Sequence, residues 1–204
     1  MKNKKELVFI ILGAVLILGA LLLYLYNGYE DNEAGQQAEV VASEIISAIE
    51  NKEVIQIKPE EPMEEERTEL EVVMIDGYEY IGYLKIDALG LNLPILSNWS
   101  NNGLKIAPCR HFGSSITDDL VIAAHNYKSH FGYIYKLKSG DRVTFTEMDG
   151  FENIYEFSGM ITVKGTDVEA VQNSGHDLAL YTCTSGGQSR IVVFFDRVTD
   201  EEVA

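Results

Sequence analysis

The stretch Asp177-Leu-Ala-Leu-Tyr-Thr-Cys-Thr-Ser-Gly-Gly-Gln-Ser-Arg-Ile-Val-Val-Phe-Phe195 contains the pattern that decides the fold of the C-terminal region. Apolar residues at both ends favour two strands, and Ser185-Gly-Gly187 favours a turn between them. Cys183 falls where the first strand ends, and Arg190 falls where the second begins. Antiparallel pairing would make them neighbours in space. The stretch therefore predicts a thiol beside a permanent positive charge at one end of a sheet.

Short apolar segments separated by turn residues continue this pattern throughout residues 78–204. They predict strands at Tyr80–Ile86, Leu91–Leu96, Asp119–Ala124, Arg142–Glu147, Asn153–Lys164, Leu178–Cys183 and Ile191–Val198. Short helical pieces are expected near Trp99–Leu104 and Phe131–Leu137. So many short strands in about 125 residues favour an all-β domain, either a closed barrel or a sandwich.

The N-terminal segment has the composition of a membrane span. Residues 7–26 carry no charge, and about 20 apolar residues are needed to cross a bilayer as a helix. Lysines precede this run and acidic residues follow it, which predicts a cytoplasmic N-terminus (residues 1–6) and an extracellular remainder. A cleaved signal peptide is the alternative, but its apolar core is shorter and ends in small residues. Here the run ends in Leu21-Leu-Leu-Tyr-Leu-Tyr26.

Residues 27–77 are expected to form an acidic extracellular stem. Residues 31–76 hold 14 acidic and 3 basic side chains, a net of −11 within a total of −16. This balance disfavours nucleic acid as a partner. Helical spacing of apolar residues predicts one amphipathic helix at Ala38–Asn51, with an apolar face made of Val40, Val41, Ile45, Ile46 and Ile49. The segment Lys58–Glu66 combines two prolines with acidic residues and predicts an extended linker.

A histidine follows the most hydrophobic of the predicted strands, in the order Leu120-Val-Ile-Ala-Ala-His125. Imidazole is suited to proton transfer near neutral pH, and it can serve a cysteine nucleophile. The alternative is a histidine that ends the strand and hydrogen-bonds a backbone carbonyl. These residues alone do not decide between the two.

Three motifs taken together resemble the sortase family, the membrane-anchored cysteine transpeptidases of Gram-positive bacteria. The family pattern has a histidine at a strand end, a T-L-x-T-C strand and an arginine on the next strand. Here the motifs read Ala124-His-Asn126, Ala179-Leu-Tyr-Thr-Cys183 and Arg190-Ile-Val-Val193, with Ala179 in place of the first threonine. The resemblance covers about residues 78–198.

The resemblance implies a closed eight-stranded β-barrel with short helices, preceded by the membrane helix and the stem. It also implies that Cys183 attacks the Thr carbonyl of an LPxTG-like C-terminal sorting signal and forms a thioester. His125 would protonate the departing amine and then deprotonate the incoming one, and Arg190 would hydrogen-bond the substrate or the oxyanion. Around this catalytic trio, the expected substrate-binding residues are Thr182, Ala124 and Asn126.

The expected partners are a surface-protein sorting signal and an amine acceptor such as a peptidoglycan precursor, with the enzyme held at the cell membrane. A pilin-polymerising sortase, a surface cysteine protease and a non-catalytic scaffold remain alternatives. The short interval between Cys183 and Arg190 leaves no room for the helical insertion of class B enzymes. Residues 27–77 contain no Asp-Pro-Trp-type lid motif, so by elimination the chain resembles a compact class A, D or E type barrel or an unclassed clostridial-like relative.

No cofactor is expected. The residues that could bind a metal are Asp118 and Asp119 with Glu147 or Asp149 for calcium, and Cys109 with His111 for zinc. Scattered carboxylates and one Cys-x-His pair are weak patterns for either metal. Cys109 is expected to be a small buried side chain or an incidental thiol. A Cys109–Cys183 disulfide is the alternative, and it would disable the nucleophile. His130 and His176 lie among polar residues and are expected at the surface.

Overall fold

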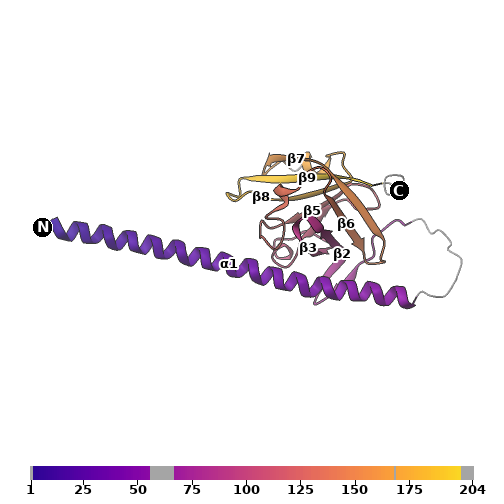
Figure 1. Ribbon diagram of the computed structural model, residues 1–204, viewed down its shortest axis with the longest axis horizontal. Helices are drawn as coiled ribbons and strands as arrows, with labels where there is room; N and C mark the ends of the chain where they lie inside the picture. Colours follow the sequence, from indigo (N-terminus) through magenta and orange to yellow (C-terminus); the bar gives the residue numbers. More distant parts are fainter. Residues whose placement is uncertain (1, 56–66, 168, 199–204) are drawn as a thin grey trace. The chain divides into compact units, whose positions relative to one another are not determined.

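The computed structural model describes residues 2–55, 67–167 and 169–198, which fall into two compact units, Met1–Glu33 and Ala34–Ala204. The predicted linker Lys58–Glu66 lies outside the described residues. Figure 1 labels the main elements. In chain order they are α1 (Lys2–Ile55), β1 (Val73–Ile75), β2 (Tyr78–Ile86), η1 (Asp87–Leu89), β3 (Leu91–Leu96), η2 (Gly103–Lys105), β4 (Cys109–Phe112), β5 (Leu120–Ala124), η3 (Ile134–Lys136), β6 (Arg142–Glu147), β7 (Glu152–Lys164), α2 (Glu169–Gln172), β8 (Leu178–Cys183) and β9 (Ser189–Arg197).

The first unit is the N-terminal part of α1. Within this helix, the stretch Glu6–Asn51 is long and apolar enough, by length and composition, to cross a membrane. It includes the uncharged run at residues 7–26.

The second unit contains one sheet in the order β1-β2-β3-β4-β5-β8-β9-β7-β6. A further pairing of β2 with β6 closes the eight strands from β2 to β9 into a barrel, and β1 adds a ninth strand beside β2. The prediction of a closed eight-stranded barrel is thereby confirmed. The sheet begins at Val73, before the expected boundary at residue 78, because β1 and β2 form a tight hairpin through Asp76 and Gly77.

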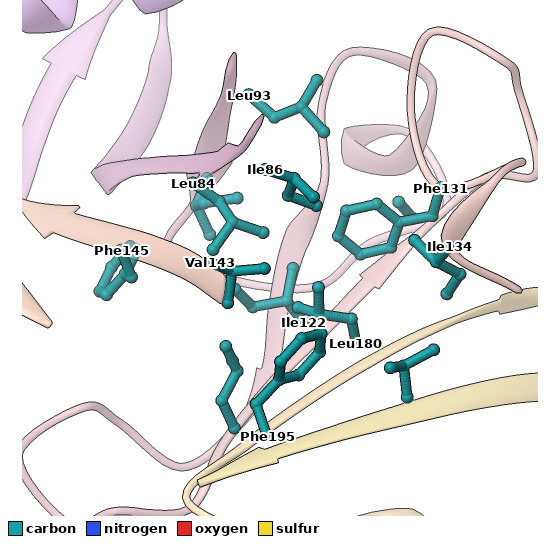
Figure 2. Packing of buried hydrophobic residues seen from close by; sticks show 14 of the residues in the cluster. Leu84, Ile86, Leu93, Ile122, Phe131, Ile134, Val143, Phe145, Leu180 and Phe195 are labelled. Atoms are coloured by element: carbon teal, nitrogen blue, oxygen red, sulfur yellow. The ribbon is translucent and has the colours of Figure 1, made fainter. Parts of the chain in front are cut away.

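Side chains on each strand point alternately into and out of the barrel, and the inward-pointing ones form the core. Leu178 and Leu180 on β8 point into the barrel, where they pack with Ile122 of β5 and Phe195 of β9. Figure 2 shows Ile122, Leu180 and Phe195 together at the centre of this cluster. Because successive strand residues face opposite sides, Ala179 and the residues in step with it face outward. Cys183 belongs to this outward-facing set.

The C-terminal part of α1 packs against the barrel within the second unit. Its buried positions repeat at helical spacing and comprise Ala34, Ala38, Val41, Ala42, Ile45 and Ile49. The predicted amphipathic helix is therefore present, although its apolar face is shifted: Val40, expected on that face, is 58% exposed. Alanines at three of the buried positions let the helix lie close to the barrel.

Gly35 lies at a close contact between α1 and the barrel. A Cβ atom at Gly35 would lie 2.8 Å from Cβ of Ser129, in the loop that follows His125. Gly35→Leu is therefore expected to destabilise the fold by about 1–3 kcal/mol. Thermal unfolding of the full chain would measure this effect. Gly28→Leu is the matched control, since a Cβ at Gly28 meets no atom within 4 Å; equal effects of the two changes would contradict the prediction.

Candidate active site

Cys183 and Arg190 lie directly opposite each other on β8 and β9. The turn between the two strands is held by hydrogen bonds from Thr184 N to Ser189 O at 3.0 Å and from Gly187 N to Thr184 O at 2.8 Å. Gly187 has a φ of 69°, a left-handed conformation that favours glycine. The sequence Ser-Gly-Gly is thus what lets a strand pair bring the thiol and the guanidinium together.

The Arg190 guanidinium is fixed by its own turn. Its Nη1 donates to the carbonyl oxygens of Gly187 at 3.0 Å and Ser189 at 3.1 Å. Arginine carries five N–H donors and stays protonated, so these two bonds leave other donors for a ligand. The group is half-buried, which places a positive charge beside the thiol without removing it from solvent.

His125 reaches the same end of the barrel through the neighbouring strand. β5 and β8 are parallel, with Ala124 opposite Thr182, so His125 and Cys183 are the next residues on adjacent strands. Adjacent strands lie about 4.8 Å apart. Both side chains are half-buried. A thiol, an imidazole and a guanidinium therefore lie at the same end of the barrel.

Thr182 stabilises the pairing of β8 with β5. Its Oγ1 donates to the carbonyl oxygen of Ala124 at 2.9 Å, and both residues are buried, at 3% and 6% exposure. Their side chains face the barrel interior, where they fix β5 against β8 beneath the site. Asn126, in contrast, is exposed on the loop. Direct substrate contact by these three residues stays a prediction, and the position of Asn126 is the one open to a peptide.

The loop after His125 is tightly folded. The carbonyl oxygen of His125 accepts a bond from Phe131 N at 3.2 Å, and that of Tyr127 accepts from His130 N at 3.0 Å. A Cβ at Gly132 would lie 2.6 Å from the Asn126 oxygen, so only glycine fits there. This turn carries the His130 side chain inward, to full burial, with its ring 5.6 Å from the Tyr127 ring. The expectation of a surface His130 is therefore wrong.

His176 occupies a different face, on the segment before β8. Its Nδ1 lies 2.7 Å from Oδ1 of Asp196, and its ring stacks on Phe194 at 4.7 Å between centroids. The side chain is 29% exposed. It has the position of a surface histidine held by a carboxylate.

Cys109 has the properties of a structural thiol. Both cysteines are free, and Cys109 is fully buried, with Sγ 3.4 Å from the carbonyl oxygen of Ala107. Burial raises the pKa of Cys109 to about 11. It therefore stays protonated and unreactive near neutral pH. The neighbouring His111 bonds Tyr181 instead, with 2.7 Å between the Tyr181 hydroxyl and Nδ1.

A cavity of about 200 Å³ opens beside Arg190 on the outward face of β8 and β9. Sequence reasoning missed it, because its residues come from separate segments. Tyr181, two positions before Cys183 and on the same face, was the available signal. The lining comprises Trp99, His111, Phe112, Val163, Lys164, Gly165, Asp167, Val171, Tyr181 and Arg190.

The carboxylates considered for calcium bind arginines or backbone groups. Arg67 contacts Glu147 and lies 3.0 Å from Oδ2 of Asp149. Asp118 accepts two bonds from Arg197, at 2.8 and 2.6 Å. Within the part of the chain that the structure describes, no group of three or more His, Cys, Asp or Glu side chains is arranged to hold a metal ion.

Arg67 neutralises a carboxylate that is 1% exposed, and Glu147 also accepts bonds from Ser115 at 2.8 Å and Asn153 at 2.7 Å. Arg67→Ala would leave this buried charge without its cation, so we expect a loss of about 3 kcal/mol in the free energy of unfolding. Denaturant unfolding would measure it. The control is Arg142→Ala, which removes an exposed pair with Glu156 and should cost less than about 1 kcal/mol. A loss for Arg67→Ala no larger than that of the control would refute this role.

Comparisons with known proteins agree with this geometry. The family model described as Sortase domain matches residues 84–198, more than half of the chain. The search of curated proteins gave no match. Among solved structures, a Clostridium perfringens sortase D5 transpeptidase is 20% identical, with a TM-score of 0.52, covering 59% of this chain and 79% of that chain.

Two sortase C structures are similar in the same way. The Streptococcus pneumoniae sortase C is 23% identical, with a TM-score of 0.53, covering 84% of this chain and 89% of that chain. The C. perfringens sortase C with its C-terminal cell wall sorting motif is 20% identical, with a TM-score of 0.52, covering 78% of this chain and 89% of that chain. At these identities the likeness concerns the fold.

Proposed function

This chain belongs to the sortase family and is a cysteine transpeptidase, and from that premise we propose that it cleaves an LPxTG-like sorting signal and joins the acyl group to an amine. The observation that carries the proposal is the common edge formed by the ends of β5, β8 and β9. His125, Cys183 and Arg190 meet there. A half-buried thiol beside a guanidinium and an imidazole suits acyl transfer.

In the first half-reaction, the Cys183 thiol gives its proton to His125, and the sulfur attacks the carbonyl carbon of the signal's threonine. The carbonyl oxygen gains negative charge, and the free N–H groups of Arg190 stabilise it. Collapse of this intermediate breaks the carbon–nitrogen bond, and His125 gives its proton to the departing amine. The products are a thioester on Cys183 and a free C-terminal peptide.

In the second half-reaction, an incoming amine attacks the thioester. His125, now neutral, accepts the proton that the amine loses, and the carbon–sulfur bond breaks. A new amide forms, and His125 passes the proton to the departing sulfur, which regenerates the thiol. The acceptor we propose is an amine of a peptidoglycan precursor; the lysine of a pilin subunit is the second candidate.

The location we propose is the cell membrane, with a single span, a cytoplasmic N-terminus and an extracellular barrel. Support comes from the apolar stretch in the first part of α1, together with the lysines before it and the acidic residues after it. This location would place the barrel where exported surface proteins emerge. Alkylation of single cysteines introduced before and after the span, in intact cells, would test the orientation.

The reaction is tested with the full chain in detergent, a panel of LPxTG-like peptides, and two amines: a glycine peptide and a lysine-bearing peptide. Mass spectrometry follows the thioester and the products. A ligated product supports transpeptidation, and the preferred amine separates cell-wall anchoring from pilin polymerisation. Hydrolysis alone with every amine would show a protease. The absence of any thioester, with Cys183 resistant to alkylation, would show a scaffold.

A further inference from the structure

The ninth strand, β1, lies outside the eight-stranded barrel, and the site described above does not use it. A tight turn joins β1 to β2, with a φ of 49° at Asp76 and 82° at Gly77. This hairpin and the loop that follows β3 together bound a cavity of about 260 Å³, here called the hairpin cavity. Its lining side chains include Met74, Tyr78 and Glu79 of the hairpin and Ser97, Asn98 and Ser100 of the loop.

The loop that bounds the hairpin cavity is fixed by hydrogen bonds. Ser97 N donates to the Glu79 carbonyl oxygen at 2.8 Å, and the Ser97 carbonyl oxygen accepts from Nε of Arg110 at 2.8 Å. Further along the loop, Gly103 N donates to Oγ of Ser100 at 2.8 Å. A Cβ at Gly103 would lie 2.9 Å from that oxygen, so glycine lets the loop stay close. The cavity is therefore formed before any ligand arrives, as small-molecule sites usually are.

Three polar side chains form a connected row in this cavity. Nδ2 of Asn98 donates to Oγ of Ser97 at 2.8 Å, and Ser97 Oγ donates to Oε2 of Glu79 at 3.0 Å. Ser97 is buried, at 2% exposure, whereas Glu79 and Asn98 are exposed. These two bonds leave Glu79 its second carboxylate oxygen and leave Asn98 its carbonyl oxygen and one N–H. The row therefore offers both acceptors and a donor to a ligand.

The remaining lining narrows the class of ligand. Among the described residues around the cavity, Glu79 alone carries a charge, so neither Lys nor Arg is there to bind a phosphate. Met74 and Tyr78 add apolar surface, at 62% and 37% exposure. The volume is slightly below the range of about 300–1,000 Å³ that encloses whole small molecules. A single sugar ring fits these properties, because its hydroxyl groups both donate and accept and its C–H faces are apolar.

The hairpin cavity lies at the same end of the barrel as the proposed active site. One row of paired residues crosses β3, β4, β5 and β8: Leu96, Cys109, Ala123 and Tyr181. Three steps between adjacent strands separate its two ends by about 14 Å along the rim. The loop also connects the two places, since Trp99 lines the cavity beside Arg190 while its neighbour Asn98 lines the hairpin cavity.

We propose that the hairpin cavity is a saccharide site that binds one uncharged N-acetylated sugar ring carried by the amine acceptor. An N-acetyl group presents one N–H and one carbonyl oxygen, which match the free acceptor and donor of Asn98. This inference rests on the proposed function and adds the part of the acceptor that is recognised away from the reacting amine. An extended peptide covers about 3.3 Å per residue, so about four residues would join the bound sugar to an amine at Cys183.

Binding is measured first without turnover. Trp99 is the single tryptophan of the chain and lies in the loop that bounds the cavity, so its fluorescence reports occupation. Full-length Cys183→Ala, in a detergent without a sugar headgroup, is titrated with N-acetylglucosamine. A saturable change with a Kd on the order of 1 mM is expected for a ligand of this size. Sorbitol, an acyclic polyol, should give no saturable change; equal binding of the two would overturn the inference.

Two asparagines of the same loop provide a matched pair of variants. Asn98→Ala removes the amide that lines the cavity and should raise the Kd for N-acetylglucosamine about tenfold, the effect of losing one or two hydrogen bonds. Asn101→Ala removes an exposed amide outside the lining and should keep the Kd within about twofold. Equal Kd values for the two variants would contradict the assignment of Asn98.

A cationic ligand is the competing class, because Glu79 is a carboxylate. Glycinamide, which is positively charged at neutral pH, is therefore titrated in parallel. Glu79→Gln keeps an acceptor oxygen beside Ser97 and should keep the Kd for N-acetylglucosamine within about threefold. If glycinamide bound more tightly than the sugar, and Glu79→Gln abolished its binding, the cavity would be an ammonium site and the saccharide assignment would be wrong.

The role in acceptor recognition is tested with the active full chain and a sorting-signal peptide that acylates it. N-acetylglucosamine is joined to an amine through a peptide of two or four residues. The four-residue acceptor should have a kcat/KM at least about tenfold above that of the same peptide without the sugar. The two-residue acceptor should show no gain, since about 6.6 Å cannot span the separation. Asn98→Ala should lose the gain, and Asn101→Ala should keep it.

The outcomes separate this inference from the proposed function. If a thioester forms and amines react equally with and without the sugar, the inference fails and transpeptidation stands. If the sugar binds but no peptide of the panel forms a thioester, the proposed function fails, and with it the acceptor role of the cavity. If free N-acetylglucosamine, added beside the plain amine peptide, gave the same gain as the joined molecule, the sugar would not belong to the acceptor and that assignment would be overturned.

Discussion

Cys183→Ala is expected to abolish thioester formation and to lower transpeptidation by more than about 10³-fold, since no other accessible thiol can form the acyl intermediate. Cys183 is half-buried at the end of β8, opposite Arg190. The other cysteine is fully buried and its burial raises its pKa to about 11. Intact-protein mass spectrometry after mixing with a sorting-signal peptide would detect the acyl-enzyme directly.

The chain offers a matched control for this change. Cys109→Ala removes the second thiol from a packed position and should leave thioester formation intact, although stability falls by about 1 kcal/mol. Single labelling with an alkylating agent should then report Cys183 alone. Full turnover by Cys183→Ala, or loss of the thioester in Cys109→Ala with the fold intact, would reassign the nucleophile.

His125→Ala is expected to lower kcat by about 10²–10⁴-fold, the usual contribution of general acid–base catalysis. Its place is set by the parallel pairing of β5 with β8, one residue beyond the Thr182–Ala124 hydrogen bond. A small, good leaving group needs no protonation, so an activated thioester peptide should acylate the variant far better than an amide peptide does. Stopped-flow acylation with the two peptides would measure the difference.

His176→Ala is the control histidine. It removes an imidazole that pairs with Asp196 on another face of the barrel, so kcat should stay within about twofold of the wild type. An equal loss from both changes would mean that the effect is structural. If His125→Ala slowed acylation by the amide peptide and by the thioester peptide to the same extent, His125 would not be the general acid.

The barrel could be predicted from the sequence because its strands are marked by alternation and by glycine-containing turns. All seven predicted strands are present. β1 has three residues and β4 has four, one of them a bulge at His111, so neither carries enough alternation to be recognised. The prediction put Val40 on the buried face of its helix, but Val40 is exposed. The buried face instead includes the small residues Ala34, Ala38 and Ala42, which a search for large apolar side chains does not mark.

The sequence also predicted one part of the proposed site and missed another. Cys183 and Arg190 could be paired because a short turn joins their strands, and His125 could be added because it ends a hydrophobic strand. Tyr181 and His111 lie 70 residues apart, and nothing local relates them. The burial of His130 likewise depends on a turn around Gly132 whose closeness to Asn126 only the fold reveals.

The parallel pairing of β5 with β8 has a consequence for the maturation of the enzyme. A parallel pair cannot be closed by a hairpin, and residues 125–177, which include β6, β7 and α2, separate the two strands along the chain. Such non-local contacts form late and slowly in folding. The imidazole and the thiol therefore stay apart in a newly made chain until the barrel closes. Transpeptidase activity should appear only with the final cooperative step of refolding.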